Sequence, residues 1–318
     1  MSGGAGGSAA RIQTCVHTVF GHRAFLMIRN LFPGVAKRPA RAALFMSGSG
    51  TNAEALLRYH AGNSGCSFIP ALIVTDAPES GRAREIAATW KIPLAELDIR
   101  AFYAERGETA IALTSERRRA IRAEWTDALR RLIAPWKIDF GVLAGFVPLC
   151  NIAADIPCLN VHPGDLTLES GGRRLLAGLH FRPVETAILA GHPALRSSVI
   201  LAQPFRGSGE AEMDSGPVLG VSVPVPVELD GESVASLAAA DAARVRAPYR
   251  DRLREVAEAN LERLKLRGDH AVLPRAADDF AAGRFGLDGG QLCFREDGYG
   301  WTPVRTVEYG PHGRRLLS

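Results

Sequence analysis

Two polar side chains stand at the end of a short apolar segment and have the types that acid–base chemistry needs. Asn160 and His162 lie two residues apart in the run 158–162, so on an extended strand they project from the same face. Pro163 cannot continue a central strand, which places both side chains at the rim of a sheet. Because α/β enzymes hold reactive groups at such strand ends, we predict that this pair forms the catalytic centre.

A third polar residue completes the predicted centre. Asp214 lies in the segment 212–217, between a flexible loop and a later predicted strand. A carboxylate beside His162 would orient the imidazole and raise its pKa, and it could hold a water that relays a proton. The alternative, that His162 is a purely structural histidine, is weakened by its combination with Asn160 and Asp214.

A glycine-rich turn after the first predicted strand is a candidate anion site. Free backbone N–H groups and the helix dipole at a strand–turn–helix junction favour a negatively charged ligand. The turn matches neither the full Walker A pattern nor the full dinucleotide fingerprint, and a tight turn alone would also require glycine. The residues concerned are Gly48, Ser49, Gly50, Thr51 and Asn52.

Short apolar runs alternate with amphipathic segments through the first half of the chain. This order predicts an α/β fold with a doubly wound, mainly parallel sheet. Ligands in such folds lie beyond the carboxyl ends of the strands, where the turn, residues 145–149 and residues 160–162 all fall. Strands are expected at 42–46, 69–75, 92–97, 139–146, 158–162 and 196–204, and helices from 53, at 83–90, 116–133 and 183–190.

The second half of the chain gives weaker patterns. Residues 218–227 contain Pro224 and Pro226 and are expected to form an edge strand. Residues 231–267 should be helical with a break near Pro248, and residues 285–294 should form a hairpin. We therefore expect a catalytic domain at 41–267, an N-terminal extension at 1–40 and a C-terminal helical and β-hairpin extension at 268–318.

The composition excludes several classes of protein. The 318 residues are 47% hydrophobic with a net charge of +4, and they show no clustered basic stripe, so we expect no nucleic-acid partner. No run of about 18 apolar residues occurs, so we expect no membrane partner. Five scattered cysteines indicate reduced thiols in a cytoplasmic protein, with neither a metal site nor a disulfide framework. The acid-poor leader is either a transit peptide or a loose extension that packs residues 19–20 and 25–28 on the domain.

The motifs together resemble the folate-dependent formyltransferases, most of all the phosphoribosylglycinamide formyltransferases. The resemblance covers about residues 42–266 and implies a Rossmann-like core. It also implies 10-formyltetrahydrofolate as the donor and, as the acceptor, the amine of a small phosphorylated molecule such as glycinamide ribonucleotide, in purine biosynthesis. The matching segments are Ser47–Asn52, Val142–Phe146, Asn160–Pro163, Leu179–His180 and Asp214–Pro217.

The same resemblance implies a role for each site residue. The glycine-rich turn would hold the acceptor's phosphate, and Phe146, Val147 and Leu149 would line the folate pocket. Asn160, His162 and Asp214 would be the catalytic trio. Asn160 and a protonated His162 would donate hydrogen bonds to the formyl oxygen as it gains negative charge, so that neither a metal nor a covalent nucleophile is required.

The chain departs from that family directly after the catalytic pair. A longer loop at 169–177 leaves the acceptor open, and a 10-formyltetrahydrofolate hydrolase or a non-catalytic ligand-binding relative remain alternatives. Arg173 and Arg174 could clamp a phosphate, but we expect solvated side chains. His180 is either part of the site wall or a packing residue, and Asp165 is expected to form a turn. Small-molecule substrates are expected, and a homodimer is left open.

Overall fold

A nine-stranded, mostly parallel sheet forms the centre of the computed structural model, which describes residues 28–35, 37–204, 214–245 and 248–318. The strand order is β17-β16-β11-β10-β6-β5-β2-β3-β4. The five strands from β6 to β4 run parallel, and β10 pairs antiparallel with β6. The bounds are β2 Ala40–Met46, β3 Phe68–Thr75, β4 Leu94–Glu96, β5 Phe140–Leu143, β6 Cys158–His162, β10 Ser198–Leu201, β11 Val218–Ser222, β16 Thr306–Gly310 and β17 Gly313–Leu317.

Helices cover both faces of this sheet because its central strands are apolar on both sides. In β2, Leu44 and Met46 face the cluster beneath α1 (Thr51–Gly62), α2 (Ala83–Trp90) and α8 (His270–Ala281). Phe45 faces the opposite cluster beneath α3 (Ile99–Ala104) and α4 (Glu116–Ile133). The sheet with these two helical layers is the doubly wound core that the sequence predicts.

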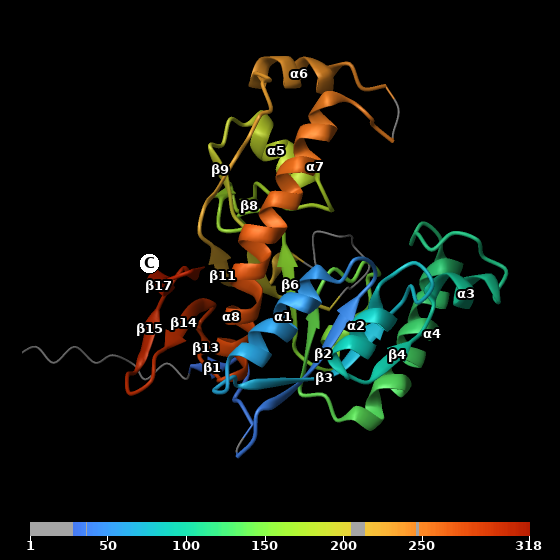
Figure 1. The fold of residues 1–318 in the computed structure, drawn as a ribbon, viewed down its shortest axis with the longest axis vertical. Helices are drawn as coiled ribbons and strands as arrows, with labels where there is room; N and C mark the ends of the chain where they lie inside the picture. Colours follow the sequence, from blue (N-terminus) through green and yellow to red (C-terminus); the bar gives the residue numbers. More distant parts are fainter. Residues whose placement is uncertain (1–27, 36, 205–213, 246–247) are drawn as a thin grey trace, which may run out of the picture.

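A second group of helices projects from the sheet as an upper lobe, seen at the top of Figure 1. It contains α5 (Arg182–Leu189), α6 (Val234–Ala242) and α7 (Arg252–Leu264), which share an apolar cluster that includes Leu237 and Leu253. Two short strands, β9 (Ala194–Leu195) and β12 (Val225–Pro226), pair beside it.

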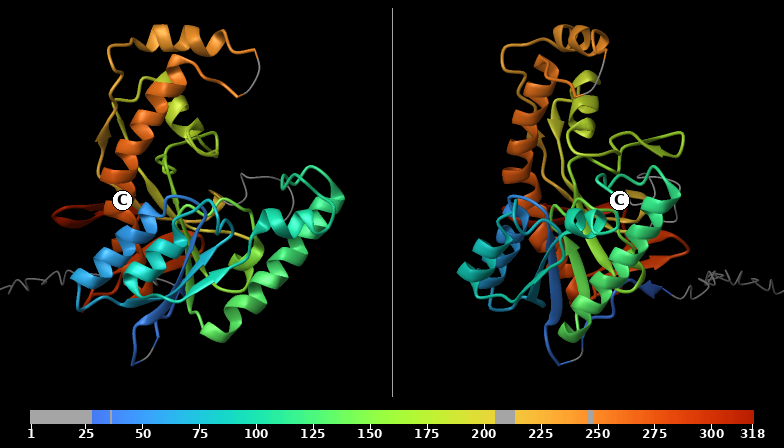
Figure 2. Two further views of the ribbon diagram at one scale, coloured as in Figure 1. Left: turned by 45° about the vertical axis from the view of Figure 1, so that its right-hand side comes forward. Right: turned by 90° about the vertical axis from the view of Figure 1, so that its right-hand side faces the viewer.

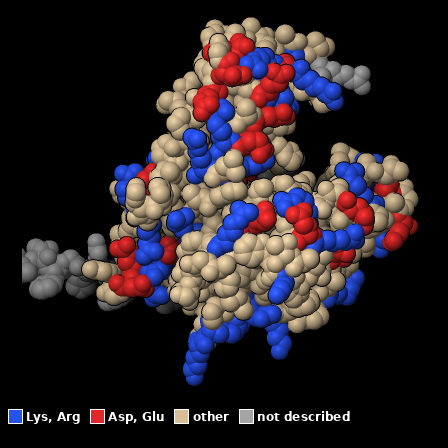
Figure 3. Space-filling model, viewed as in Figure 1, with Lys and Arg blue, Asp and Glu red and all other residues tan. Residues whose placement is uncertain are grey.

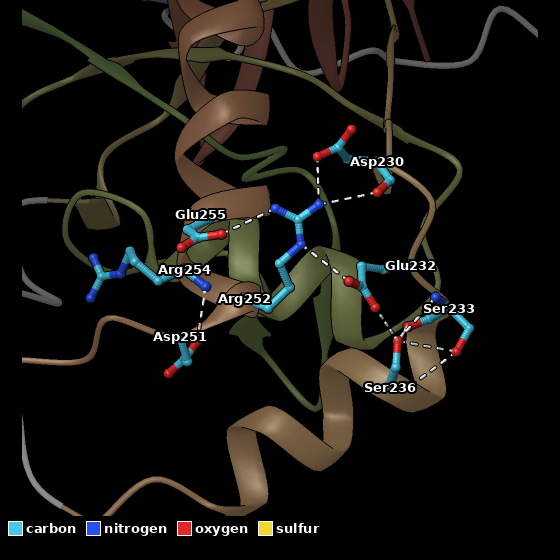
Figure 4. A network of polar contacts seen from close by, with 8 residues as sticks. All are labelled: Asp230, Glu232, Ser233, Ser236, Asp251, Arg252, Arg254 and Glu255. Carbon is cyan, nitrogen blue, oxygen red and sulfur yellow. Dashed lines mark hydrogen bonds and ion pairs between the residues drawn. The ribbon is translucent and has the colours of Figure 1, made fainter.

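Ion pairs hold together the end of the upper lobe that lies away from the sheet, where α7 begins (Figure 1). Arg252 contacts Asp230, Glu232 and Glu255, and Ser236 links Glu232 to the start of α6 (Figure 4). Figure 2 shows α7 running from this point down to the sheet, where a π-helical turn at Lys265–Asp269 joins it to α8. The upper lobe is thus tied to the core by one continuous helical run.

Most of the predicted elements are present, and two need correction. Helices α2 and α4 have the predicted bounds. The strand expected at 139–146 ends at Leu143, since Gly145 takes a positive φ of 82°. The expectation of an edge strand at 218–227 is wrong, because β11 lies between β10 and β16 and the two prolines fall after it.

The segment after residue 267 packs against the same core as the segment before it. The expected boundary falls inside the helical run from α7 to α8, and β16 joins the central sheet beside β11. The expected hairpin forms from β13 (Phe285–Asp288) and β14 (Gln291–Arg295), and β1 (Arg29–Asn30) and β15 (Trp301–Pro303) flank it. Tyr309 of β16 donates a hydrogen bond to the buried Asp279 of α8.

The cysteines and the N-terminal segment are only partly within the described residues. Cys66, Cys150, Cys158 and Cys293 are buried free thiols, as predicted, whereas Cys15 lies outside the described residues. Residues 19–20 and 25–27, which were expected to pack on the domain, also lie outside them. Across the ranges that the structure describes, no helix combines the length and apolar character that crossing a membrane needs.

Phe280 tests whether residues 268–318 unfold with the core. Its ring is buried in α8 and packs on Phe32 and Phe140, with ring centroids 5.2 and 5.7 Å away. We expect Phe280→Ala to lower the free energy of unfolding by about 3–5 kcal/mol within a single urea transition. Tyr299→Ala, at an exposed site, serves as the control. Two separate transitions, only one of them shifted, would contradict a common core.

Candidate active site

The end of β6 carries the predicted pair at the carboxyl edge of the sheet. Cys158, Asn160 and His162 alternate along the strand toward the face that α4 covers. Asn160 is half-buried, and the His162 side chain is only 3% exposed. An imidazole held this far from water must find its hydrogen-bond partners inside the protein.

Both ring nitrogens of His162 have protein partners. Nε2 lies 2.7 Å from the carbonyl oxygen of Leu176, and Nδ1 lies 3.4 Å from Oδ2 of Asp214. A carbonyl oxygen can only accept, so Nε2 carries a proton and Nδ1 is the nitrogen that can gain or lose one. The expectation that a protonated His162 donates to the formyl oxygen therefore meets an obstacle, because Leu176 already occupies Nε2.

Burial sets the protonation of this pair. It lowers the pKa of His162 below its ordinary 6.5 and outweighs the opposing effect of the Asp214 charge. It likewise raises the pKa of Asp214 above 3.8, against the charges of His162 and Arg174. The prediction that Asp214 raises the imidazole's pKa is correct for that one contribution and wrong for the net shift. The pair thus has room for one more proton between Nδ1 and Oδ2.

The turn that carries Asp214 is fixed from two sides. A Cβ on Gly216 would stand 1.8 Å from the carbonyl oxygen of Leu201 in β10, so only glycine fits there. On the other side, the Arg174 guanidinium donates hydrogen bonds to the carbonyl oxygens of Asp214 and Gly216. Arg174 was expected to be solvated or to clamp a phosphate; its side chain is instead 17% exposed and holds backbone.

The glycine-rich turn lies between β2 and α1, at the same edge of the sheet. Gly50 has a φ of 68°, and a Cβ there would stand 2.5 Å from Ile86 and from Met46. The left-handed backbone conformation therefore favours glycine here whether or not an anion binds. The N-terminus of α1 has no side-chain cap, so its first N–H groups can serve an anion.

Ser47, which the sequence interpretation passed over as a site residue, links three strand ends. Its hydroxyl donates to Asp76 at the end of β3 at 2.5 Å and accepts from the Val147 N–H at 2.8 Å. Burial raises the pKa of Asp76. The sequence signal for this contact is weak: Ser47 and Asp76 are short polar residues that directly follow two predicted strands.

A buried polar cluster joins the turn to the neighbourhood of His162. Asn52 donates to Asp269 of the π-helical turn at 3.0 Å, and Ser197 donates to the other carboxylate oxygen at 2.5 Å. Ser198, the next residue, stands opposite His162 in the β6–β10 register. Burial raises the pKa of Asp269 to about 6. The turn is therefore linked through Asp269 and Ser197 to the strand that pairs with the end of β6.

The residues assigned to a folate pocket follow β5. Phe146 packs between Phe45 and Trp125, with ring centroids 5.4 and 6.2 Å away. Val147 is 57% exposed, and Leu149 is half-buried, with its carbonyl oxygen bound by Arg122 at 2.8 Å. Phe146 and Val147 thus present an apolar ring and an exposed apolar side chain beside the turn.

His180 was expected either to form part of the site wall or to pack at the entry of α5. It lies in the turn before α5 with an exposed side chain and a positive φ of 54°. Asp165 forms the expected turn, since Oδ1 accepts from the Thr167 N–H at 3.0 Å. Within the described ranges, no group of three or more His, Cys, Asp or Glu side chains is arranged to hold a metal ion.

A deep hollow separates the upper lobe from the part of the core that carries α3 and α4 (Figure 3). A cavity of about 1190 Å³ lies within the upper lobe between α5, the end of α6 and the start of α7, and Ala177, Gly178 and Leu179 form part of its wall. These residues directly follow Leu176, the partner of His162. The cavity is large enough for a small-molecule substrate, and its wall begins one residue after Leu176, but Asn160, His162 and Asp214 do not line it.

Solved structures share this fold. Glycinamide ribonucleotide transformylase 1 from Symbiobacterium toebii superposes with a TM-score of 0.54 at 21% identity, covering 81% of this chain and 95% of that one. Phosphoribosylglycinamide formyltransferase from Coxiella burnetii gives 0.52 at 18%, covering 84% and 96%. A formyltetrahydrofolate deformylase from Pseudomonas syringae pv. tomato gives 0.51 at 13%, covering 82% and 67%.

The similarity is one of structure and not of overall sequence. No protein-family model matches the chain, and no curated protein matches it. The resemblance inferred from the motifs is confirmed at the level of the fold, which is the formyltransferase fold.

Asp269 should make stability depend on pH. Its folded-state pKa of about 6 exceeds the ordinary 3.8, so the folded state binds the proton more tightly than the unfolded state. Relative to Asp269→Asn, the wild type is therefore favoured below pH 3.8 and loses that advantage as pH rises through 6, by at most about 3 kcal/mol. Urea titrations from pH 4 to 8 measure the difference.

Glu258→Gln, at an exposed carboxylate of α7, serves as the control for the removal of a carboxylate from a surface site. A difference between Asp269→Asn and wild type that stays constant with pH would show that the buried carboxylate does not titrate in this range.

Proposed function

We propose that the protein transfers a formyl group from 10-formyltetrahydrofolate to the amine of a small, phosphorylated acceptor, with glycinamide ribonucleotide as the first candidate. One observation carries the proposal: a buried His162–Asp214 pair lies at the end of the strand that presents Asn160, within a formyltransferase fold. The glycine-rich turn at the same edge of the sheet supports an anionic acceptor.

Asn160 stabilises the charge that develops during transfer. When the amine attacks the formyl carbon, the carbonyl oxygen gains negative charge. Asn160 is half-buried on the strand face that it shares with His162, and its amide donates a hydrogen bond to that oxygen. Fixed donors of this kind contribute most where water is excluded.

The His162–Asp214 pair receives the proton that the amine loses. The Asp214 side chain is 12% exposed and is the more accessible member of the pair. It takes the proton directly or through a water, and Nδ1 of His162 shares it. Because Nε2 is held by Leu176, the ring keeps the tautomer that leaves Nδ1 free to accept. The collapse of the intermediate then returns a proton to the folate nitrogen.

Phe146, Val147 and Leu149 supply the donor side of the site. The packing of Phe146 between two aromatic rings fixes one wall, and Val147 offers apolar surface to the pterin. Mostly apolar walls with a few fixed polar groups are typical of cofactor pockets.

A hydrolase is the second candidate, because a formyltetrahydrofolate deformylase shares the fold and the loop after His162 is longer than the resemblance predicts. Incubation with 10-formyltetrahydrofolate alone separates the candidates. Formate release without an amine indicates hydrolysis, whereas dependence on an added amine indicates transfer. A panel of phosphorylated and unphosphorylated amines then tests the anion site. If neither water nor any amine supports turnover, the protein is a non-catalytic ligand-binding relative.

The catalytic pair should be essential for turnover but not for folding. We expect His162→Ala and Asp214→Asn each to lower kcat by about 10²–10⁴-fold, since each removes one half of the proton acceptor. Production of tetrahydrofolate, followed by absorbance, measures the rate, and urea midpoints monitor folding.

His312→Ala provides a matched histidine control at an exposed turn between β16 and β17, and we expect it to keep the wild-type rate. Wild-type rates in both site variants would overturn the assignment of the pair.

A further inference from the structure

The loop that distinguishes this chain makes direct contact with the catalytic pair. It contains a short hairpin of two antiparallel strands, β7 (Glu169–Ser170) and β8 (Arg173–Arg174), each two residues long. Gly171 and Gly172 join them. Both glycines have positive φ, 57° and 74°, as a tight two-residue hairpin turn requires. The hairpin turns the chain back so that Arg174 and Leu176 meet the site.

Arg174 approaches the turn of Asp214 with two parallel donors. Its Nη1 binds the carbonyl oxygen of Asp214, and its Nη2 binds that of Gly216 at 2.8 Å. The planar guanidinium can hold two carbonyl groups at once, which an ammonium group cannot do in the same way. Since Gly216 has no room to move toward β10, the turn is clamped between Arg174 and the sheet.

Leu176 holds the other half of the pair. Its buried side chain belongs to the apolar cluster of the upper lobe, while its carbonyl oxygen accepts from Nε2 of His162. Gly164 lies against it so closely that a Cβ there would stand 2.7 Å from that oxygen. One short segment thus orients the ring of His162 and the carboxylate of Asp214 from opposite ends.

The base of the loop is itself anchored. The Ser198 hydroxyl accepts from the Leu166 N–H at 2.9 Å and donates to the Gly164 carbonyl at 2.7 Å. The Leu175 N–H donates to the Leu168 carbonyl at 2.9 Å, which closes the loop above the hairpin. These contacts leave Arg174 little freedom to adopt another arrangement.

We propose that Arg174 is a positioning residue for the reaction, acting through the backbone of Asp214 to set the distance between its carboxylate and Nδ1 of His162. The expected effect on kcat rests on the proposed function. The expected effect on the His162–Asp214 contact can be measured on the free protein. Without the clamp, the turn loses two hydrogen bonds to its backbone, and the carboxylate can shift relative to the ring. A displacement of about 1 Å is enough to cost about 10²-fold in rate.

The charge of Arg174 adds a second, separable effect. Asp214 and Arg174 are the charged groups that act on His162, and Glu169 lies 3.6 Å from Arg174. The positive charge of Arg174 lowers the pKa of both His162 and Asp214, besides the larger effect of burial. Removing it should therefore move the protonation of the pair to higher pH.

Three variants separate the hydrogen bonds from the charge. Arg174→Met removes both, Arg174→Lys keeps the charge but not the paired donors, and Arg173→Met alters the exposed neighbour on the same hairpin as the matched control. For each, kcat and KM for 10-formyltetrahydrofolate are measured from pH 5 to 9, and urea midpoints confirm folding. The ring nitrogens of His162 are titrated by NMR in the free protein, with His162→Ala to identify their signals.

We expect Arg174→Met to lower kcat by about 10–100-fold with KM changed less than about twofold, and to move the acidic limb of the rate profile and the His162 titration to higher pH. Arg174→Lys should lower kcat less and leave the titration close to wild type. Arg173→Met should match wild type in every measurement.

Different outcomes overturn different claims. If Arg174→Met keeps the wild-type kcat and the wild-type His162 titration, Arg174 is not a positioning residue. If the wild type itself transfers no formyl group to amine or water, the proposed function fails, and the NMR titration still decides whether Arg174 governs the pair. A loss of stability with unchanged titration and kcat would mark Arg174 as purely structural and overturn the inference.

Discussion

The buried imidazole of His162 is the constraint on which the site depends. Both of its nitrogens are committed, one to a backbone carbonyl and the other to a carboxylate. Burial alone would favour the neutral forms of the imidazole and the carboxyl group. The contact between Nδ1 and Asp214 gives each buried group a polar partner. The strand end, the divergent loop and the turn of Asp214 each supply one part of this arrangement. Moving any of them leaves a buried polar atom without a partner, which is costly.

The sheet brings these parts together because its parallel strands all end at one edge. The turn after β2, Asp76 after β3, Phe146 after β5 and His162 in β6 come from distant parts of the sequence. Small polar contacts connect them, above all the Ser47 hydroxyl and the Asn52–Asp269–Ser197 cluster. The helical run from α7 to α8 joins the lower end of the upper lobe to the same cluster through Asp269.

Local pattern was sufficient for the core and for part of the site. Apolar alternation gave helices α2 and α4 and the parallel order, and Pro163 marked the strand end that carries His162. The contact between His162 and Asp214 also followed, once the motifs were taken together. The net direction of the imidazole's pKa did not, because it depends on how deeply the fold buries the ring, and spacing says nothing about depth.

Other features depend on contacts between residues far apart in the sequence. Arg174 reads as a solvated arginine on a polar loop, and only the fold places it over the turn forty residues later. β11 lies inside the sheet because β16, near the end of the chain, pairs with its outer side. Local sequence pattern could not predict this pairing. The link from Asn52 to Asp269 spans more than two hundred residues and has no signal in either segment.

The most direct test of the central claim follows the formyl carbon itself. The wild-type protein is mixed with 10-formyltetrahydrofolate carrying ¹³C in the formyl group and with glycinamide ribonucleotide, and the ¹³C spectrum is recorded over time. Formyl transfer predicts that the label leaves the folate and appears as a new N-formyl amide, at a rate that His162→Ala lowers by about 10²–10⁴-fold. A label that stays on the folate, or that leaves it equally fast with the variant, would contradict the account.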